Sequence, residues 1–423
     1  MLIWLINHYA VPPKYYPLAR QTYFAKHLIS MGHEVRIIAA STVHNSDLNL
    51  ITDGAQCQEE IIDGIKYTYI HCHGYQGNGL ARMYNMCEFA LKLPNVCKQF
   101  SAPDVIVSTS MPPFSCAMGI RLAKKYGIKG IAEIADLWPE SIVVYGLARK
   151  RNPVISMLYK LEKWIYKKAD AIIFTMEGGR DYIIEKGWDK AHGGPIDLRK
   201  VYHINNGVDL ESFHQNLYEN AYHDKDLDDE ASFKVVYTGS VRRANNIDLV
   251  IDAAKLLHDT RVSFLIYGDG TELERLKQRC KDEQVNNVVF KNVVEKKHIP
   301  SILSRSDLNF FVLEDSNLFR FGLSLNKSFE YLASGKPLLI IGRAAYSMVD
   351  KYKCGLHVQA TDAREFADAV MRIKDQSRDA YLTMCDNARK AANDYDFKVL
   401  AKNLIKVIEK TAEDKQAVDE GVK

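Results

Sequence analysis

Short apolar runs alternate with longer segments in which apolar positions recur every three to four residues, along nearly the whole chain. The short runs predict buried strands, and the longer periodic segments predict helices. In the first half the predicted strands are residues 2–6, 34–39, 66–70, 105–108, 130–134, 171–175 and 201–204, and the predicted helices include residues 22–31, 114–126, 154–168 and 178–186. Such alternation is typical of a parallel sheet covered by helices on both faces.

A second alternation of the same kind begins at Phe233. Its predicted strands are residues 234–237, 262–267, 288–290, 308–312 and 338–341, and its predicted helices are residues 247–258, 272–281, 299–304, 327–333 and 363–373, with a last helix from 397 to about 410. We predict an α/β protein with two Rossmann-like domains that face each other across a central cleft. The expected divisions are an N-terminal domain at 1–208, a linker at 209–232, a C-terminal domain at 233–395, and a helix with a polar tail at 396–423.

In the second half, the loop and helix at 321–337, FGLSLNKSFEYLASGKP, carry the clearest candidate chemistry. We expect the helix to begin near Asn326, with Ser324 or Asn326 as its N-cap. A helix N-terminus attracts anions, Lys327 adds a full positive charge there, and Glu330 lies one turn further on the same face. Phosphate donors beside a carboxylate that can accept from sugar hydroxyls suit a nucleotide sugar. The alternative is an ordinary capped helix with a weak surface pair of Lys327 and Glu330.

Two further loops in the second half also follow predicted strands. The first contains Gly239, Ser240, Arg242 and Arg243, where a glycine allows close backbone approach and arginines can pair with phosphate oxygens. A solvated basic loop would show the same residues. The second begins at Gly268, in a GxG pattern that is weak by itself. The pattern GxGxxG does not occur in either half, which disfavours a dinucleotide-dependent oxidoreductase.

In the first half, candidate side chains for an acceptor follow two predicted strands. Arg20 comes after the first strand and is a candidate to face the cleft. Asp136, Trp138 and Glu140 follow the strand at 130–134, and carboxylates beside an indole suit hydroxyl binding and ring stacking. We predict that Asp136 is catalytic and orients hydroxyls of the donor or acceptor, and that Trp138 and Glu140 lie on the acceptor side. A capped helix start with Trp138 in the core is the alternative.

Composition and charge narrow the classes of partner. The chain has 423 residues, 47% hydrophobic and 26% charged, and a net charge of +3, so no general attraction to nucleic acid is implied. Its eight scattered cysteines predict free thiols. We expect no metal site, because no cluster has metal-ligand spacing and the acidic segment 224–230, which contains Asp226 and Asp228, is predicted to be a solvated loop. We also expect no cofactor.

One segment suggests a membrane surface as a partner. Arg149–Lys168 has seven basic residues and one acidic residue, and its apolar residues share a helical stripe with Trp164. Basic charge beside aromatic side chains fits an anionic leaflet, whereas a helix packed on the sheet with a solvated basic face is the alternative. No apolar run approaches the ~20 residues needed to span a bilayer.

Six segments together resemble the retaining family 4 glycosyltransferases of GT-B fold, and within them the WbuB-like transferases of O-antigen and capsule assembly. These segments are GHEV at 32–35, DLWPES at 136–141, NNGVD at 205–209, YTGS at 237–240, YGDGTELERL at 267–276 and GLSLNKSFEYLASGKP at 322–337. Two positions depart from the family pattern. Gly322 stands where the first glutamate of the paired-glutamate motif is expected, and Ala135 stands where many members have a histidine.

The resemblance implies a nucleotide diphosphate-sugar donor in the C-terminal domain, an acceptor in the N-terminal domain, retention at the anomeric carbon and no essential metal. It implies that Glu330 binds the ribose hydroxyls and that the backbone around Val293 meets the base. We therefore expect a UDP-sugar donor, a lipid-linked sugar acceptor and a peripheral position at the inner face of the membrane. Two alternatives stay open, a GT-B sugar epimerase and a GT-B partner protein that binds nucleotide without turnover.

Overall fold

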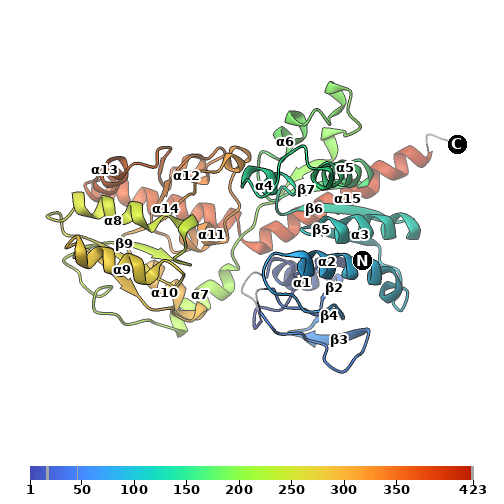
Figure 1. The fold of residues 1–423 in the computed structure, drawn as a ribbon, viewed down its shortest axis with the longest axis horizontal. Helices are drawn as coiled ribbons and strands as arrows, with labels where there is room; N and C mark the ends of the chain where they lie inside the picture. Colours follow the sequence, from blue (N-terminus) through green and yellow to red (C-terminus); the bar gives the residue numbers. More distant parts are fainter. Residues whose placement is uncertain (16–18, 45, 421–423) are drawn as a thin grey trace. The chain divides into compact units, whose positions relative to one another are not determined.

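Two parallel sheets, each with its own hydrophobic core, form the two units of the chain (Figure 1). The computed structural model describes residues 1–15, 19–44 and 46–420, with side chains as far as Thr411. Unit 1 consists of Met1–Asn205 together with the chain from Phe397 onward, and unit 2 consists of Asn206–Asp396. Within the described residues, no helix combines the length and the apolar character that crossing a bilayer requires.

Unit 1 carries a sheet of eight strands in its described part, in the order β3-β4-β2-β1-β5-β6-β7-β8. All neighbouring strands are parallel except the edge pair β3 and β4. The strands are β1 (Leu2–Ile6), β2 (Glu34–Ala40), β3 (Cys57–Ile62), β4 (Ile65–Ile70), β5 (Val105–Ser110), β6 (Lys129–Ile134), β7 (Ala171–Phe174) and β8 (Val201–His203).

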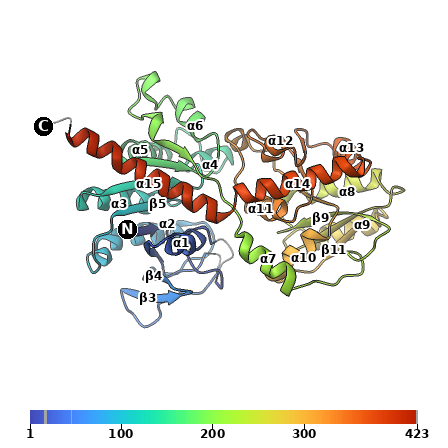
Figure 2. The ribbon, with the colours of Figure 1, turned by 180° about the vertical axis from the view of Figure 1, so that it is seen from behind.

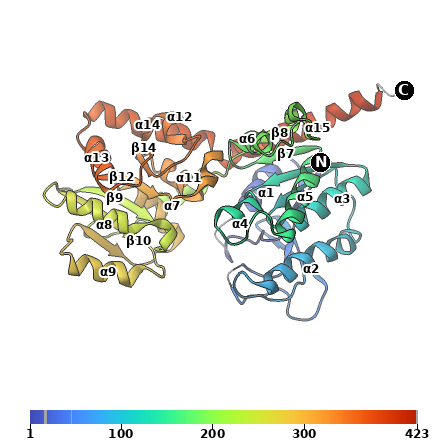
Figure 3. The same ribbon diagram turned by 45° about the horizontal axis from the view of Figure 1, so that its top comes forward.

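Helices cover both faces of this sheet. They are α1 (Arg20–Ser30), α2 (Leu80–Cys97), α3 (Pro113–Tyr126), α4 (Glu140–Val144), α5 (Pro153–Lys168), α6 (Gly179–Glu185) and α15 (Phe397–Glu420), with the 3-10 turns η1 (Lys190–His192) and η2 (Leu198–Lys200). Helices α2, α3 and α5 lie side by side on one face (Figure 3), and α1 lies beside α15 on the other (Figure 2).

Strand β1 shows why the first strands read as continuous apolar runs. Successive side chains of a strand point to opposite faces. Ile3 and Leu5 therefore pack in the core beneath α1 and α15, whereas Trp4 and Ile6 pack in the core beneath α2 and α3. Because both faces are covered, a polar residue is tolerated on neither side of the strand.

Unit 2 carries a sheet of six parallel strands in the order β11-β10-β9-β12-β13-β14, among the residues described. The strands are β9 (Phe233–Thr238), β10 (Val262–Tyr267), β11 (Val288–Lys291), β12 (Leu308–Val312), β13 (Leu338–Ile341) and β14 (Gly355–Val358). The helices are α7 (Leu210–Glu219), α8 (Ile247–Leu256), α9 (Leu273–Asp282), α10 (Ile299–Ser304), α11 (Asn326–Ala333), α12 (Met348–Tyr352), α13 (Ala363–Lys374) and α14 (Arg378–Asp394), with the 3-10 turns η3 (Arg243–Asn245), η4 (Lys296–His298) and η5 (Asn317–Phe321).

The unit boundaries differ from the predicted ones in two places. The predicted linker at 209–232 belongs to unit 2, because it forms α7 and buries Leu210 and Phe213 in the core of that unit. The predicted separate helix and tail at 396–423 belong to unit 1, because Phe397 and neighbouring apolar residues of α15 complete the core on α1.

The prediction that the acidic segment 224–230 is a solvated loop is only partly right, because Lys225 and residues 228–230 are exposed whereas Asp224 and Asp226 are half-buried and Leu227 is buried. Lys291, at the end of β11, donates to the carboxylates of Asp224 at 2.7 Å and Asp226 at 2.5 Å. Asp228 pairs with Arg305. These ion pairs hold the segment against unit 2, and they occupy both carboxylates of the Asp-x-Asp pattern.

Candidate functional site

The strand order of unit 2 reverses between β9 and β12. Open α/β sheets bind ligands at such a switch point, beyond the carboxyl ends of the strands. Strand β12 pairs with β9 only at Val235 and Val236, so the two strands separate before β9 ends. The loops that follow β9 and β12, and helix α11, therefore meet at the point where the sheet opens.

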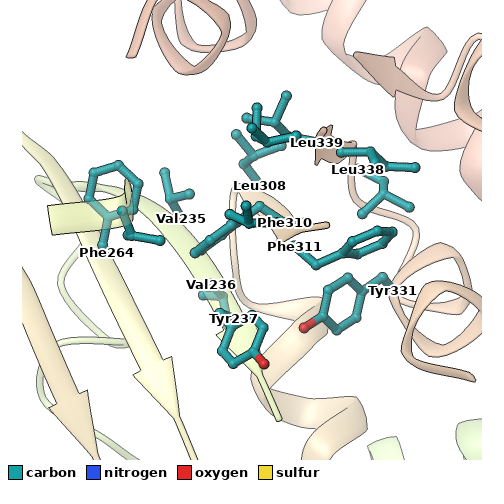
Figure 4. Close-up of a cluster of buried hydrophobic side chains, with 14 of the residues drawn as sticks. Val235, Val236, Tyr237, Phe264, Leu308, Phe310, Phe311, Tyr331, Leu338 and Leu339 are labelled. Atoms are coloured by element: carbon teal, nitrogen blue, oxygen red, sulfur yellow. The ribbon is translucent and has the colours of Figure 1, made fainter. Parts of the chain in front are cut away.

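Tyr331 of α11 closes the gap left by the separating strands. Its hydroxyl accepts from the Thr238 N–H at 2.8 Å and donates to the Thr238 carbonyl at 3.0 Å, so both backbone groups at the end of β9 are satisfied by one side chain. The ring is fully buried, and Figure 4 shows its hydroxyl near that of Tyr237 at one edge of the core. This pair of bonds fixes α11 against β9, and we did not predict it.

Lys327, in the first turn of α11, is the cation nearest to this edge. Its ammonium donates to the Tyr237 hydroxyl at 3.2 Å and lies 4.7 Å from the centre of that ring. Tyr237 in turn donates to the Ser240 carbonyl at 2.8 Å. No carboxylate in the described part of the chain pairs with Lys327, and burial lowers its pKa to about 8. A half-buried lysine without an anionic partner is costly for the protein, so this position favours the binding of an anion.

The N-terminus of α11 adds backbone donors to this charge. The helix begins at Asn326 as predicted, but Leu325 is its N-cap and no side chain caps it, so the expected capping by Ser324 or Asn326 is wrong. Within the described residues, the N–H groups of Asn326 and Lys327 have no acceptor. Unpaired N–H groups at a helix start attract an anion.

Gly239 in the loop after β9 and Gly268 in the loop after β10 have different structural roles. Gly239 has φ +148°, and a Cβ there would lie 3.0 Å from the Tyr237 hydroxyl, so a side chain would crowd the phenol that Lys327 contacts. Gly268 has φ +150°, and its Cβ would lie 1.8 Å from the Gly239 carbonyl oxygen. We predicted Gly268 as a donor-binding residue. In the structure its lack of a side chain lets the β10 loop pack on the β9 loop.

The basic residues of the β9 loop are available for a ligand. Arg242 and Arg243 are exposed, and in the described part of the chain neither guanidinium has a partner. Ser240 is also exposed, and its hydroxyl donates to the Asn245 side chain at 3.1 Å. The loop therefore presents two exposed cations in addition to the charge of Lys327.

Glu330 does not pair with Lys327, which excludes the surface pair that we considered. Its Oε1 lies 3.5 Å from the ammonium of Lys296 in η4. That turn follows the segment 292–294, in which Val293 is 66% exposed. Among the described residues, this long and half-exposed contact is the one that the Glu330 carboxylate makes, and it can be exchanged for the hydroxyls of a ligand, because such pairs contribute little.

Two predicted donor-binding residues before α11 take part in the local fold. Gly322 has φ +101°, is buried, and donates its N–H to the Phe319 carbonyl at 3.0 Å where η5 ends. The Ser324 carbonyl accepts from the side chain of Asn206 at 3.0 Å. These contacts shape the loop that leads into α11.

The three predicted acceptor residues have structural partners in unit 1. Arg20 donates to Glu133 at 2.9 Å and to the carbonyls of Ile204 and Asn205, so its guanidinium is fully engaged. Trp138 is buried against Phe114 and residues of α5, as our alternative held.

Glu140 is buried and accepts from Tyr159 and Lys186. The structure thus gives no support to Arg20, Trp138 or Glu140 as acceptor ligands. Asp136 differs from them, because it is exposed at the carboxyl end of β6 and has no hydrogen-bond or ion-pair partner among the described residues.

The segment Arg149–Lys168 is only partly buried. Leu158, Ile165 and Tyr166 of α5 are buried in unit 1, as expected for a helix packed on the sheet. The lysines of the last turn are exposed, and so are Val154 and Met157 at the start of α5. The basic face and two apolar side chains therefore remain available.

Comparison with known families assigns each unit. The family described as "Glycosyltransferase Family 4" matches residues 21–212, and the family described as "Glycosyl transferases group 1" matches residues 219–393. The chain is a GT-B glycosyltransferase. The predicted fold is therefore confirmed, and Lys327, Glu330 and the β9 loop lie in the part that matches the group 1 transferases.

Two curated relatives are similar along most of the chain. The probable glycosyltransferase WbjE of Pseudomonas aeruginosa is 22% identical over 70% of this chain and 71% of its own length. The putative colanic acid biosynthesis glycosyl transferase WcaI of Escherichia coli K12 is 23% identical over 67% of this chain and 70% of its own length.

Solved structures show the same fold. Sucrose-phosphate synthase from Thermosynechococcus elongatus has a TM-score of 0.67 and 18% identity, over 97% of this chain and 98% of the other. HepE from Anabaena, solved in complex with UDP and glucose, has a TM-score of 0.64 and 15% identity, over 96% of this chain and 99% of the other.

Proposed function

We propose that this glycosyltransferase moves a sugar from a UDP-sugar to a polyprenyl-diphosphate-linked acceptor during the assembly of a surface polysaccharide. The observation that carries the proposal is the charge of Lys327, which has no carboxylate partner among the described residues and lies at the start of α11, where no side chain caps the helix. One turn further on the same helix, Glu330 offers a carboxylate. In a nucleoside diphosphate-sugar the phosphates lie next to the ribose, so the phosphates can meet Lys327 while the ribose hydroxyls meet Glu330.

The chemical demand on this site is to stabilise a departing diphosphate. Lys327, the free N–H groups of α11, and Arg242 or Arg243 would supply that stabilisation, because fixed donors aimed at developing charge lower the barrier most. Glu330 would release Lys296 and accept from the ribose hydroxyls. Val293 would place its exposed apolar side chain and its backbone beside the base. UDP as the nucleotide is supported by the complex of HepE with UDP and glucose.

We further propose that transfer proceeds with retention at the anomeric carbon and without a metal. The carboxylates of the Asp-x-Asp pattern are engaged by Lys291 and Arg305, so the cations of the β9 loop and α11 would neutralise the phosphates instead. Asp136, which is exposed and has no partner in the described part of the chain, would orient hydroxyls of the donor or acceptor. We expect the sugar to be an N-acetylated hexosamine or its 6-deoxy form, as in WbuB-like transferases.

A role in surface polysaccharide assembly is supported by the similarity to WcaI, whose name refers to colanic acid biosynthesis. A lipid-linked acceptor requires contact with a bilayer, for which we propose the exposed basic face of Arg149–Lys168 at the inner face of the membrane. Replacement of Lys160, Lys163, Lys167 and Lys168 by Gln should reduce flotation with anionic vesicles and leave UDP binding unchanged. Equal flotation of the two proteins would remove this helix from the proposal.

The decisive experiment is a thermal-shift screen of the full chain against nucleoside diphosphates, followed by incubation with a panel of UDP-sugars. We expect UDP to stabilise the wild type and not to stabilise Lys327→Gln. Lys390→Gln is the control and should be stabilised as the wild type is, because Lys390 is an exposed lysine of α14 without a partner among the described residues. Slow hydrolysis of a UDP-sugar supports the transferase. Epimerised product without transfer would favour an epimerase, and binding without any turnover would favour a nucleotide-binding partner protein. Absence of stabilisation by UDP would refute the proposed donor.

A further inference from the structure

A polar cavity of about 360 Å³ opens in unit 1 beyond the carboxyl ends of β2 and β4. Its lining is formed mainly by polar side chains and a glycine, which are Thr42, Asp47, Asn49, Gly74, Tyr75 and Gln76. Among the described lining residues Asp47 alone is charged, and its carboxylate accepts from Gln76 at 3.0 Å. A cavity of this size and polarity suits a sugar ring, and neither the sequence patterns nor the family matches assign it a role.

A cluster of three aromatic rings and one arginine borders the cavity. The rings of Tyr9 and His44 lie 5.0 Å apart, and the His44 Nδ1 lies 2.8 Å from the hydroxyl of Tyr75, a lining residue. Arg82 of α2 donates from Nε at 3.0 Å and from Nη2 at 2.9 Å to the Tyr9 hydroxyl, and from Nη1 to Asn78. Tyr9, His44 and Tyr75 therefore form a continuous series of contacts between the Arg82 guanidinium and the cavity.

The charge of Arg82 is oriented but not neutralised. In the described part of the chain its partners are a phenol and an amide, and no carboxylate pairs with it. Burial and the nearby Arg82 lower the pKa of His44, so this histidine is held neutral beside the guanidinium. A half-buried guanidinium with neutral partners is a ready site for phosphate, because its fork matches phosphate oxygens.

Exposed apolar side chains flank the same arginine on α2. Leu80 is 88% exposed and Tyr84 is 59% exposed, and the Tyr84 ring lies 5.7 Å from that of His73, next to the lining residue Gly74. A water-soluble sugar phosphate would gain nothing from these side chains. An amphipathic ligand would gain affinity, because its apolar part would cover Leu80 and Tyr84.

We infer that this region binds the head of the isoprenoid diphosphate-linked acceptor. The diphosphate would lie on Arg82, the first sugar would enter the cavity beside Tyr75, and the isoprenoid would run over Leu80 and Tyr84. The inference rests on the proposed function, which requires a lipid-linked acceptor in this unit. It assigns the acceptor to residues other than Arg20, Trp138 and Glu140, which are engaged in the fold.

Calorimetric titration of the full chain with farnesyl diphosphate, in the presence of saturating UDP, tests the inference. UDP occupies the donor site, so the probe reports the second site. We expect Arg82→Gln to weaken binding about 10- to 150-fold, the range for loss of a charged hydrogen bond. Arg121→Gln is the matched control, because Arg121 is an exposed arginine of unit 1 without a charged partner among the described residues, and we expect it to bind as the wild type does.

The apolar flank has its own control on the same helix. We expect Leu80→Ser and Tyr84→Ser to weaken farnesyl diphosphate while leaving inorganic pyrophosphate unchanged. Leu91→Ser, at a position of α2 that is 71% exposed and away from Arg82, should change neither ligand. The thermal shift of each variant with UDP verifies that the protein has folded.

Three results would overturn the inference. They are unchanged binding of farnesyl diphosphate in Arg82→Gln, equal binding of pyrophosphate and farnesyl diphosphate in the wild type, and no binding of farnesyl diphosphate by a wild type that binds UDP. The last result leaves the proposed donor intact. Failure to bind UDP, in contrast, refutes the proposed function itself.

Discussion

The pKa of Lys327 predicts that affinity for UDP falls as pH rises above 8. Burial lowers this pKa from 10.5 to about 8, so the ammonium of the free protein loses its proton within an accessible range. A diphosphate binds the charged form. A group with a pKa of about 8 is about 90% charged at pH 7 and about 10% charged at pH 9, so we expect the dissociation constant to rise about tenfold between these values.

Calorimetry with UDP at pH 7, 8 and 9 and constant ionic strength measures this dependence. Lys327→Arg is the matched control, because a guanidinium stays charged throughout, and its affinity should be constant over the range. Lys327→Gln should bind weakly at every pH. An unchanged affinity of the wild type between pH 7 and pH 9 would refute the assignment of Lys327 to the diphosphate.

The burial of Lys327 has the opposite effect on the stability of the fold, which should rise with pH while the affinity for UDP falls. Because the folded pKa is lowered, the unfolded chain binds the extra proton between pH 8 and 10.5, and stability rises with pH in that window. The full shift corresponds to roughly 3 kcal/mol, and we discount it to about 1–2 kcal/mol because Lys327 keeps partial solvent access. Lys327→Met should therefore raise the thermal stability of the nucleotide-free protein at pH 7 while abolishing UDP binding.

Four further predictions follow from the same site. Tyr331→Phe leaves the N–H and carbonyl of Thr238 without partners and should lower the free energy of unfolding of unit 2 by about 1–3 kcal/mol in urea; an unchanged midpoint would show that water replaces the hydroxyl. Glu330→Ala should weaken UDP by about 10- to 150-fold and Glu330→Gln by less, and equal affinity in calorimetry would remove the ribose contact. Asp136→Asn should lower the turnover number by about 100-fold with UDP affinity nearly intact, and normal turnover would make it a bystander. Activity should survive EDTA, whereas loss that manganese or magnesium restores would contradict the metal-independent mechanism.

Periodicity predicted the strands of both sheets because most of them are buried on both faces. Two strands at the edges of the sheets were not predicted. Strand β3, at an edge of the sheet of unit 1, is antiparallel to β4 and has only exposed and half-buried positions, and β14, at an edge of the sheet of unit 2, is only half-buried, so neither reads as an apolar run. Helix α7 lay in a stretch that we took for a linker, because the acidic residues after it resemble a solvated segment. Only the partners Lys291 and Arg305, distant in sequence, show why the carboxylates after α7 are held against the fold.

Of the candidate site, the sequence predicted the residues whose role comes from their place on one helix, Lys327 and Glu330. It did not predict Tyr331, whose function depends on two strands separating at a point that no local pattern marks. It also misassigned Arg20 and Glu140, because a charged residue after a strand looks the same whether it faces a ligand or a buried partner. Glu133, which engages Arg20, is 113 residues away along the chain.

The return of the chain to unit 1 has a consequence for synthesis on the ribosome. Unit 2 is an insertion, since its first and last segments lie side by side where Val208 bridges Asp396. Its residues all emerge before α15 is made, so unit 2 can finish folding while one apolar face of unit 1 is still uncovered beside α1. That face is closed only when Phe397 and the apolar residues that follow it arrive. A nascent chain that stalls or terminates before residue 397 would therefore carry a complete unit 2 and a unit 1 with an exposed apolar face, which favours aggregation until α15 is made.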